Sequence, residues 1–275
     1  TPAALAATWG DSQPRSNVVG QILDKMSDVS GSSESPSSGA LGTRKAWPKL
    51  DSTTVLTRIQ NLKNNANLFN QGTIGLCTTA CFYHHMIQRN AAKFESFANA
   101  LYGGGIGYMG NLRVAPGTDL RNADYAALAA KYANMPPQAD WMLMSSLRDS
   151  ENWFFDYEGA PDESTAIETP TKELRGFYES TGLYNDVVFN EGTSVADIKA
   201  ISKTASNHIV LWIRTVLLAD LPGTHVITLE GPITVDEAND KVTFDYWTWA
   251  QPVKTMNTTL TNFKANYLGN ITASF

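Results

Sequence analysis

A glycine-punctuated loop that runs into a cysteine-bearing helix is the feature that most constrains the fold of this chain. Residues 70–83 read NQGTIGLCTTACFY, and an apolar pattern with helical spacing begins at Cys77. A thiol in the first turn of a helix lies near the positive end of the macrodipole, which favours the thiolate. Gln71 stands six residues earlier, where a flexible loop can bring its amide beside the sulfur as an oxyanion donor. The pattern predicts a nucleophile that needs a base from elsewhere.

The composition bounds the class of protein. The chain has 275 residues, of which 43% are apolar, and this is enough for one sizeable core or two lobes. The net charge of −6 and the pI of about 5.2 argue against a nucleic-acid partner. No apolar run reaches membrane-spanning length, so no membrane span is expected. The sequence begins with Thr1 rather than Met, and we therefore expect a processed protein or a fragment.

The chain contains two cysteines, Cys77 and Cys81. Four residues apart on one helix, they are poorly placed for a low-strain disulfide. Without a disulfide framework, the fold does not need an oxidising compartment to be stable. A free nucleophilic thiol also works best in a reducing environment.

The first 46 residues are expected to form an N-terminal extension rather than part of the core. Ser16 can cap a short helix, and residues 28–43 are rich in Ser, Gly and Pro, as is typical of a linker. The extension is interpreted as a chain end without stable structure, with a docking arm or a propeptide remnant as the alternatives. The globular domain is predicted to span residues 47–275.

Helical patterns fill the first part of this domain and strand patterns fill the second, which predicts an α+β fold. Helices are expected around Val55, Ile59 and Leu62, with Thr53 or Thr54 near the start, and over residues 77–90, 91–101, 123–132, 140–157, 170–182 and 194–206. Strands are expected over residues 186–189, 208–218, 225–230 and 241–249, before a helical turn and a last strand in 258–275. The glycine run 103–107 lacks the sequence context of a phosphate-binding loop and is interpreted as a flexible wall beside a cleft.

Of the four histidines, His225 is the best candidate for the base. His84 and His85 follow Cys77 on its own helix, about 10 Å along the axis, which is too far for a hydrogen bond to the thiol. His208 begins an apolar strand and is interpreted as structural. His225 opens another apolar strand, where a thiol delivered by a different element can meet an imidazole.

These segments resemble the papain-like cysteine peptidase superfamily. In that family a glutamine precedes the catalytic cysteine by six residues, and a glycine follows the glutamine directly. Gln71, Gly72 and Cys77 have the same spacing in this chain. The segment from His225 to Gly231 is similar to the family's histidine strand. The chain departs from the family at Ile74, where a disulfide-forming cysteine is common.

The resemblance also implies a third residue and an architecture. Residues 244–247, FDYW, are similar to the family's Asn-Ser-Trp, which places Asp245 as the group that orients the imidazole and Trp247 as its cover. Asp236 and Asp240 lie in a turn and fit this position less well. The implied architecture is a papain-like two-lobe fold, with the cysteine helix in a helical lobe and the histidine and aspartate in an antiparallel sheet lobe.

The function implied is that of a cysteine peptidase acting on peptide or isopeptide bonds. Gln71, Cys77, His225 and Asp245 are the expected catalytic residues, with no cofactor and no metal. A peptidoglycan amidase or endopeptidase and an acyltransferase are alternatives that use the same residues. A metal-binding module built on Cys77, Cys81 and His84, and an inactive scaffold, are alternatives from other classes.

The expected partners follow from this function. They are a protein or peptide substrate and an inhibitor or immunity protein. The acidic charge, the linker and the absence of family disulfides point to an effector or toxin of bacterial or phage type. Such a protein is secreted or delivered into a target cell.

Overall fold

The computed structural model describes residues 45–151, 159–161, 171–218, 223–248 and 252–275. The described residues belong to one compact unit. The expected extension over residues 1–46 falls outside the described part up to residue 44, as do its short helix and its linker. Pro170, the end of the expected 140–157 helix and the end of the expected 241–249 strand also lie outside the described residues.

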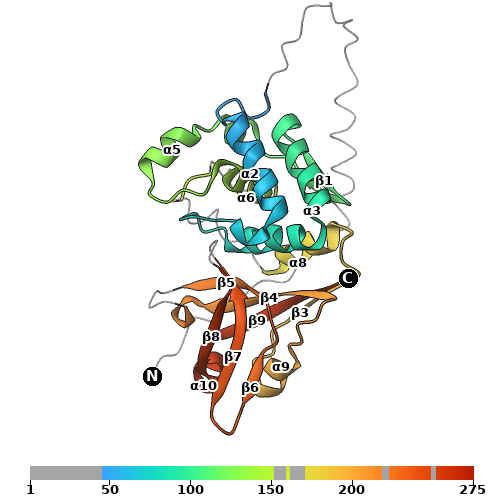
Figure 1. The fold of residues 1–275 in the computed structure, drawn as a ribbon, viewed down its shortest axis with the longest axis vertical. Coiled ribbons are helices and arrows are strands. Elements are labelled where there is room, and N and C mark those ends of the chain that lie inside the picture. Colours follow the sequence, from blue (N-terminus) through green and yellow to red (C-terminus); the bar gives the residue numbers. More distant parts are fainter. Residues whose placement is uncertain (1–44, 152–158, 162–170, 219–222, 249–251) are drawn as a thin grey trace, which may run out of the picture. The chain divides into compact units, whose positions relative to one another are not determined.

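The described residues form an α+β fold with an antiparallel sheet, which confirms the predicted class (Figure 1). Helices dominate the first part, together with a small hairpin. These elements are α2 (Ser52–Asn64), η2 (Ala66–Leu68), α3 (Cys77–Gly104), β1 (Gly107–Met109), β2 (Leu112–Val114), α4 (Thr118–Asn122), α5 (Tyr125–Lys131), α6 (Gln138–Glu151) and α8 (Thr171–Ser180).

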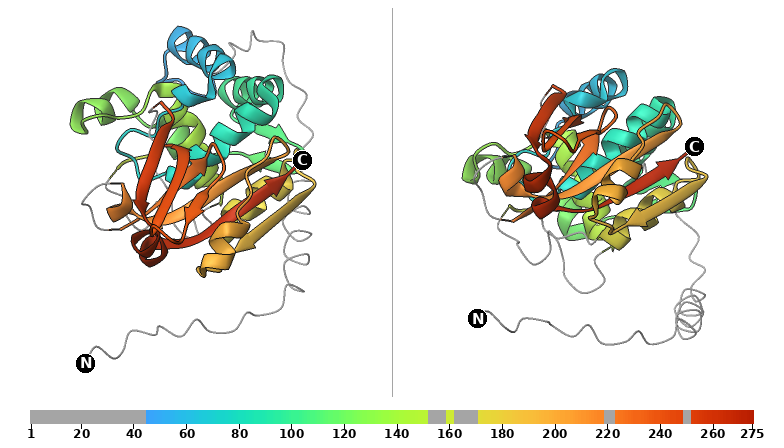
Figure 2. Two further views of the ribbon diagram at one scale, coloured as in Figure 1. Left: turned by 60° about the horizontal axis from the view of Figure 1, so that its bottom comes forward. Right: turned by 90° about the horizontal axis from the view of Figure 1, so that it is seen from below.

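The second part supplies a seven-stranded sheet among the described residues. Its elements are β3 (Asp186–Asn190), α9 (Val195–Ala200), β4 (Asn207–Arg214), η3 (Thr215–Leu217), β5 (Thr224–Leu229), β6 (Thr234–Asp236), β7 (Lys241–Trp247), β8 (Lys254–Thr259), α10 (Leu260–Asn266) and β9 (Tyr267–Ser274). The strand order is β3-β9-β4-β5-β7-β6, and β8 pairs with β7. The last strand, red in Figure 2, therefore lies between β3 and β4.

Both faces of the sheet are covered by apolar side chains. Along β4, Val210 belongs to the cluster shared with α2, α3, α6 and α8. Its neighbours Ile209 and Leu211 belong to a second cluster shared with α9 and α10. Successive side chains of a strand point to opposite faces, so a strand covered on both sides reads as an uninterrupted apolar run. This explains why residues 208–213 show no polar alternation.

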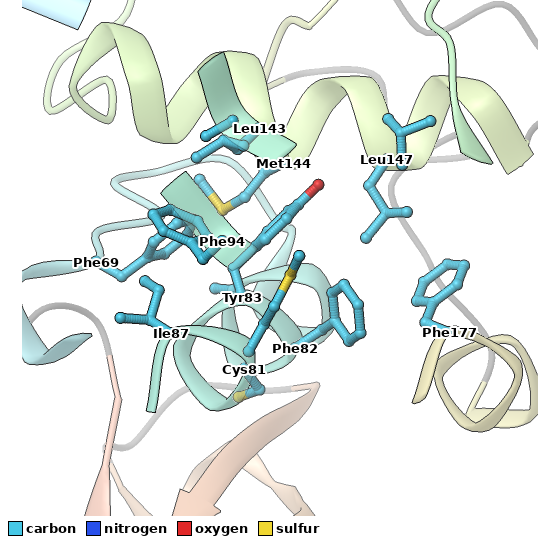
Figure 3. Packing of buried hydrophobic residues seen from close by; sticks show 14 of the residues in the cluster. Phe69, Cys81, Phe82, Tyr83, Ile87, Phe94, Leu143, Met144, Leu147 and Phe177 are labelled. Carbon is cyan, nitrogen blue, oxygen red and sulfur yellow. The ribbon is translucent and has the colours of Figure 1, made fainter. Parts of the chain in front are cut away.

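Helix α3 is buried on all sides over its first half. Every residue from Thr78 to Ile87 is buried. Phe82 packs against Phe177 of α8, and the same cluster holds Leu143, Met144 and Leu147 of α6 (Figure 3). Asn90 has non-helical backbone angles and kinks the helix, so the two helices expected over residues 77–101 follow one another in a single element.

Two expected features differ in the structure for identifiable reasons. Gly103 and Gly104 complete α3, and Gly105 ends it in the left-handed conformation, so this segment is a helix terminus rather than a flexible wall. Helix α9 ends at Ala200 rather than at residue 206. After the helix, the side chain of Asn207 accepts a hydrogen bond from the backbone N–H of Thr204 at 2.9 Å and donates one to the carbonyl of Ser202 at 2.8 Å. These bonds stabilise a turn in place of the last helical turns.

Helix α6 carries a fully buried carboxylate that connects three segments. Asp140 accepts two hydrogen bonds, each 2.8 Å long, from the guanidinium of Arg58 on α2. It also accepts from the backbone N–H of Asn70 at 2.7 Å. Burial raises the pKa of Asp140, while Arg58 and the Asn70 N–H oppose this shift by favouring the carboxylate. The same side chain therefore fixes both a helix pair and the loop that precedes Cys77.

Asp140→Asn should lower the free energy of unfolding by about 3–5 kcal/mol, because it leaves the Arg58 guanidinium, whose side chain is 18% exposed, without its counter-charge. The matched control is Glu237→Gln, which neutralises an ion pair of 2.7 Å with Lys199 in which both side chains are about half exposed. We expect this control to change stability by less than about 1 kcal/mol. Urea unfolding of both variants measures the difference, and equal losses would contradict the role given to Asp140.

Candidate functional site

The expected nucleophile occupies the first position of α3. Cys77 follows Leu76, whose side chain makes no capping hydrogen bond, so the first turn presents its backbone N–H groups beside the thiol. The Cys77 side chain is partly buried, whereas Cys81 one turn later is fully buried. The structure therefore makes the two thiols different in access.

A tight loop positions Gln71 ahead of this cysteine. Gly72 has a positive φ of 55°, and a Cβ at this position would stand 2.3 Å from the carbonyl oxygen of Asn134. The same oxygen accepts the backbone N–H of Thr73 at 3.1 Å. Gln71 is 7% exposed, and its amide nitrogen lies 3.4 Å from the carbonyl oxygen of Ile74. A glycine is required here because the loop presses its backbone against another segment.

Both sulfur atoms of α3 contact a single residue of β5. The backbone of Val226 opposes the rise in the pKa of the Cys77 thiol, and the Cys81 thiol donates to the Val226 carbonyl at 3.4 Å. In a strand, the N–H and C=O of one residue point to the same side. Helix α3 therefore lies along the edge of β5 at Val226, which is the residue directly after His225.

The thiol environment favours the neutral form in this conformation. Burial raises the pKa of Cys77, and hydrogen bonds from Val226 and Thr78 oppose that shift. Burial raises the pKa of Cys81 further, with added repulsion from Cys77 and Glu230. The helix-terminal position thus does not make Cys77 a resting thiolate, contrary to the expectation drawn from the macrodipole alone.

His225 lies at the start of β5, where it is 5% exposed and pairs with Ile213 of β4. Its Nε2 lies 2.7 Å from the hydroxyl of Thr248. Burial lowers the pKa of His225 to about 4. Both members of the expected pair are therefore neutral at pH 7. Their hydrogen bonds run to separate partners, the thiol to Val226 and the imidazole to Thr248.

The structure does not bring Asp245 to His225. Asp245 is exposed, and its carboxylate accepts from the hydroxyl of Thr255 at 2.6 Å. Its backbone carbonyl accepts from the N–H of Glu230, which is five residues, or about 16 Å, along the strand from His225. The register of β5 with β7 separates the two side chains. Trp247 is also placed elsewhere, because its ring stacks on His84 at 4.0 Å.

Thr248 is the residue near the imidazole that sequence reasoning missed. The pairing of Thr228 with Trp247 and of Leu229 with Tyr246 sets the register of β5 and β7. This register brings Thr248 to His225, whereas Asp245 lies further along. The only sequence signal was a hydroxyl next to Trp247. This signal becomes useful only when the register of β5 with β7 is known, and the sequence between the two strands does not reveal that register.

The remaining histidines form a buried group between α3 and the sheet. His84 bonds to Asn67 Oδ1 at 2.9 Å, and His85 bonds to the Tyr178 hydroxyl at 2.7 Å. His208 stacks on His85 at 4.4 Å. The trio of Cys77, Cys81 and His84 is not brought together as a metal site, since the one cluster of suitable geometry among the described residues is His84, His85 and Glu230.

Comparison with protein-family models, with curated proteins and with solved structures finds no match to this chain. In the described part, none of the helices has the length and apolar character needed to cross a bilayer.

Gly72→Ala should lower the free energy of unfolding by about 1–3 kcal/mol or more, because the residue is in the left-handed region and its new methyl meets backbone atoms of residues 134 and 136. Gly176→Ala is the matched control, since a Cβ there meets nothing within 4 Å and the residue is inside α8. This control should raise stability by about 0.5–1 kcal/mol. A neutral Gly72→Ala would show that the loop is not pinned as described.

His225 should make stability depend on pH between about 6.5 and 4. The unfolded state takes up a proton on this residue below pH 6.5, while the folded state resists it down to about pH 4. Stability is therefore lost as the pH falls, by about 2 kcal/mol from this residue between pH 7 and pH 5. Urea unfolding at both pH values should show a smaller drop for His225→Gln than for the parent. Identical drops would contradict a buried neutral imidazole.

Proposed function

We propose that this chain is a cysteine-dependent hydrolase of the papain-like type that cleaves peptide or isopeptide bonds. The observation that carries the proposal is the interaction of both α3 sulfurs with Val226. His225 directly precedes Val226 in β5, so the Cα atoms of the two residues are about 3.8 Å apart. The proposal requires the helix-borne thiol and the strand-borne imidazole to meet at this junction. The helices around α3 and the antiparallel sheet support a two-lobe organisation of this type.

In the proposed reaction, Nδ1 of His225 takes the proton of the Cys77 thiol as the sulfur attacks the substrate carbonyl. The side-chain amide of Gln71 and the backbone N–H of Cys77 donate to the oxyanion of the tetrahedral intermediate. His225 then returns the proton to the leaving amine, and a thioester remains. Water, deprotonated by the same imidazole, attacks the thioester and restores the thiol. The step requires Nδ1 to reach the sulfur while Nε2–H donates to Thr248.

Thr248 takes the orienting position that the resemblance assigned to Asp245. A hydroxyl can accept the Nε2–H and fix the tautomer, but it does not supply a negative charge to stabilise imidazolium. Since burial lowers the pKa of His225 to about 4, the pair starts as thiol and imidazole in this proposal. The proposal therefore implies proton transfer during attack rather than a resting ion pair.

The chemistry also serves a peptidoglycan amidase and an acyltransferase, which differ in substrate and acceptor. Release of cell-wall peptides distinguishes the first, and incorporation of an added amine distinguishes the second. Secretion or delivery into a target cell, and control by an inhibitor or immunity protein, stay predictions of this function.

The test is irreversible alkylation by iodoacetamide or an epoxysuccinyl probe across pH 5–9, with the site identified by mass spectrometry. We expect labelling at Cys77 that disappears in Cys77→Ala and persists in Cys81→Ala, because Cys81 is buried and bonded to Val226. His225→Ala should slow labelling by a factor of about 100 or more. Far-ultraviolet circular dichroism confirms that each variant is folded.

Two further variants separate the orienting residues. Thr248→Val should slow labelling and shift its pH profile, because it removes the hydrogen bond to Nε2. Asp245→Asn should leave both unchanged, because this carboxylate contacts Thr255 instead. Labelling that ignores His225, with a midpoint near that of an ordinary thiol, about pH 8.5, would overturn the proposed hydrolase.

A further inference from the structure

Two buried histidines and a glutamate converge below the cysteine, at the junction of α3 with the end of β5. One ligand-type atom from each of His84, His85 and Glu230 lies within 4.8 Å of the others. His84 Nδ1 and a carboxylate oxygen of Glu230 are 3.8 Å apart. The histidine side chains are 0% and 1% exposed, whereas the Glu230 side chain is 15% exposed. The cluster is therefore closed on the helix side and reachable at the carboxylate.

Each histidine uses one ring nitrogen in a hydrogen bond and leaves the other unsatisfied. Nε2 of His84 bonds to Asn67 Oδ1, and Nδ1 of His85 bonds to the Tyr178 hydroxyl. His84 Nδ1 and His85 Nε2 are fully buried and have no hydrogen-bond partner in the described structure. Buried polar atoms normally find a partner, so two unsatisfied nitrogens in one cluster call for a bound species.

The tautomers determine what kind of species fits. An amide oxygen only accepts, so His84 Nε2 carries the proton and Nδ1 presents a lone pair toward the Glu230 carboxylate. His85 reaches the same state when Nδ1–H donates to the Tyr178 oxygen. Two lone pairs and a carboxylate facing one another repel, and a cation between them removes the repulsion.

From this arrangement we propose that His84, His85 and Glu230 bind a divalent transition-metal ion of the zinc type. Two imidazole nitrogens and one carboxylate oxygen form a donor set that zinc accepts, with a fourth position open to water. Tetrahedral ligands at about 2.0–2.1 Å from zinc lie about 3.3 Å from one another, so the cluster must close by about 1.5 Å at most.

The surroundings of the three ligands match those of protein metal sites. Metal-ligating histidines usually donate their second N–H to an oxygen, and ligating carboxylates are themselves hydrogen-bonded. Here Asn67 and Tyr178 hold the two rings, and the Glu230 carboxylate accepts from the Thr228 hydroxyl at 2.7 Å and from Gln88 at 3.2 Å. The ion would join α3 to the end of β5, and this role does not depend on the proposed hydrolase activity.

The experiment is a titration of the chelator-treated full chain with Co²⁺ followed by visible absorption, and with Zn²⁺ followed by calorimetry. We expect one ion per chain and d–d bands of a low-coordinate site without sulfur-to-metal charge transfer. Glu230→Gln keeps the size of the side chain and should weaken binding by a factor of at least 10. At the same concentration, Zn²⁺ should raise the melting temperature of the parent more than that of Glu230→Gln.

Two controls keep the result specific. Glu179→Gln alters an exposed glutamate paired with Arg175 and should bind metal like the parent. Cys77→Ala should also bind normally, because the proposed ligands exclude the thiol. The proposal fails if Glu230→Gln binds as tightly as the parent, if no ion binds, or if a thiolate band appears that Cys77→Ala removes. In the last case the metal occupies the cysteine site, and labelling tests the hydrolase separately.

Discussion

A helix enclosed on every side must satisfy each of its polar groups inside the protein, and this constraint governs the centre of the structure. The first half of α3 is buried from Thr78 to Ile87, although it carries hydroxyls, a thiol and two imidazoles. Burying an unpaired polar group costs on the order of 1–3 kcal/mol. Thr79 bonds to the Leu76 carbonyl, Cys81 to Val226, and each histidine to one oxygen. The buried ring nitrogens of this helix that lack a hydrogen-bond partner, His84 Nδ1 and His85 Nε2, therefore point to a bound species.

The same enclosure couples the two parts of the fold. Aromatic and aliphatic side chains of α6 and α8 pack on one side of α3, while β5 meets it on another at Val226. The position of the α3 thiols therefore depends on how the edge of β5 is built at Val226. Asp140 adds the third constraint, since it fixes the loop at Asn70 that leads into Cys77.

Burial also explains why the protonation states differ from those expected from sequence. Desolvation disfavours both the thiolate and the imidazolium, and it outweighs the helix terminus at Cys77. The register of β5 with β7 brings Thr248 rather than Asp245 to Nε2 of His225. A shift of β7 along β5 by a few residues would bring Asp245 rather than Thr248 beside His225, so the electrostatics of the site depend on strand pairing.

The sequence by itself determined the elements and the identities of the reactive groups. Local spacing indicated the cysteine helix, the later strands and the α+β order, because helical and strand periodicities are properties of neighbouring residues. Only the tertiary structure decided that Thr248, not Asp245, meets His225, and that His84 and His85 converge on Glu230. Those encounters join residues up to 146 positions apart. They follow from strand register and helix rotation, which are fixed by packing and leave no periodic trace in the chain.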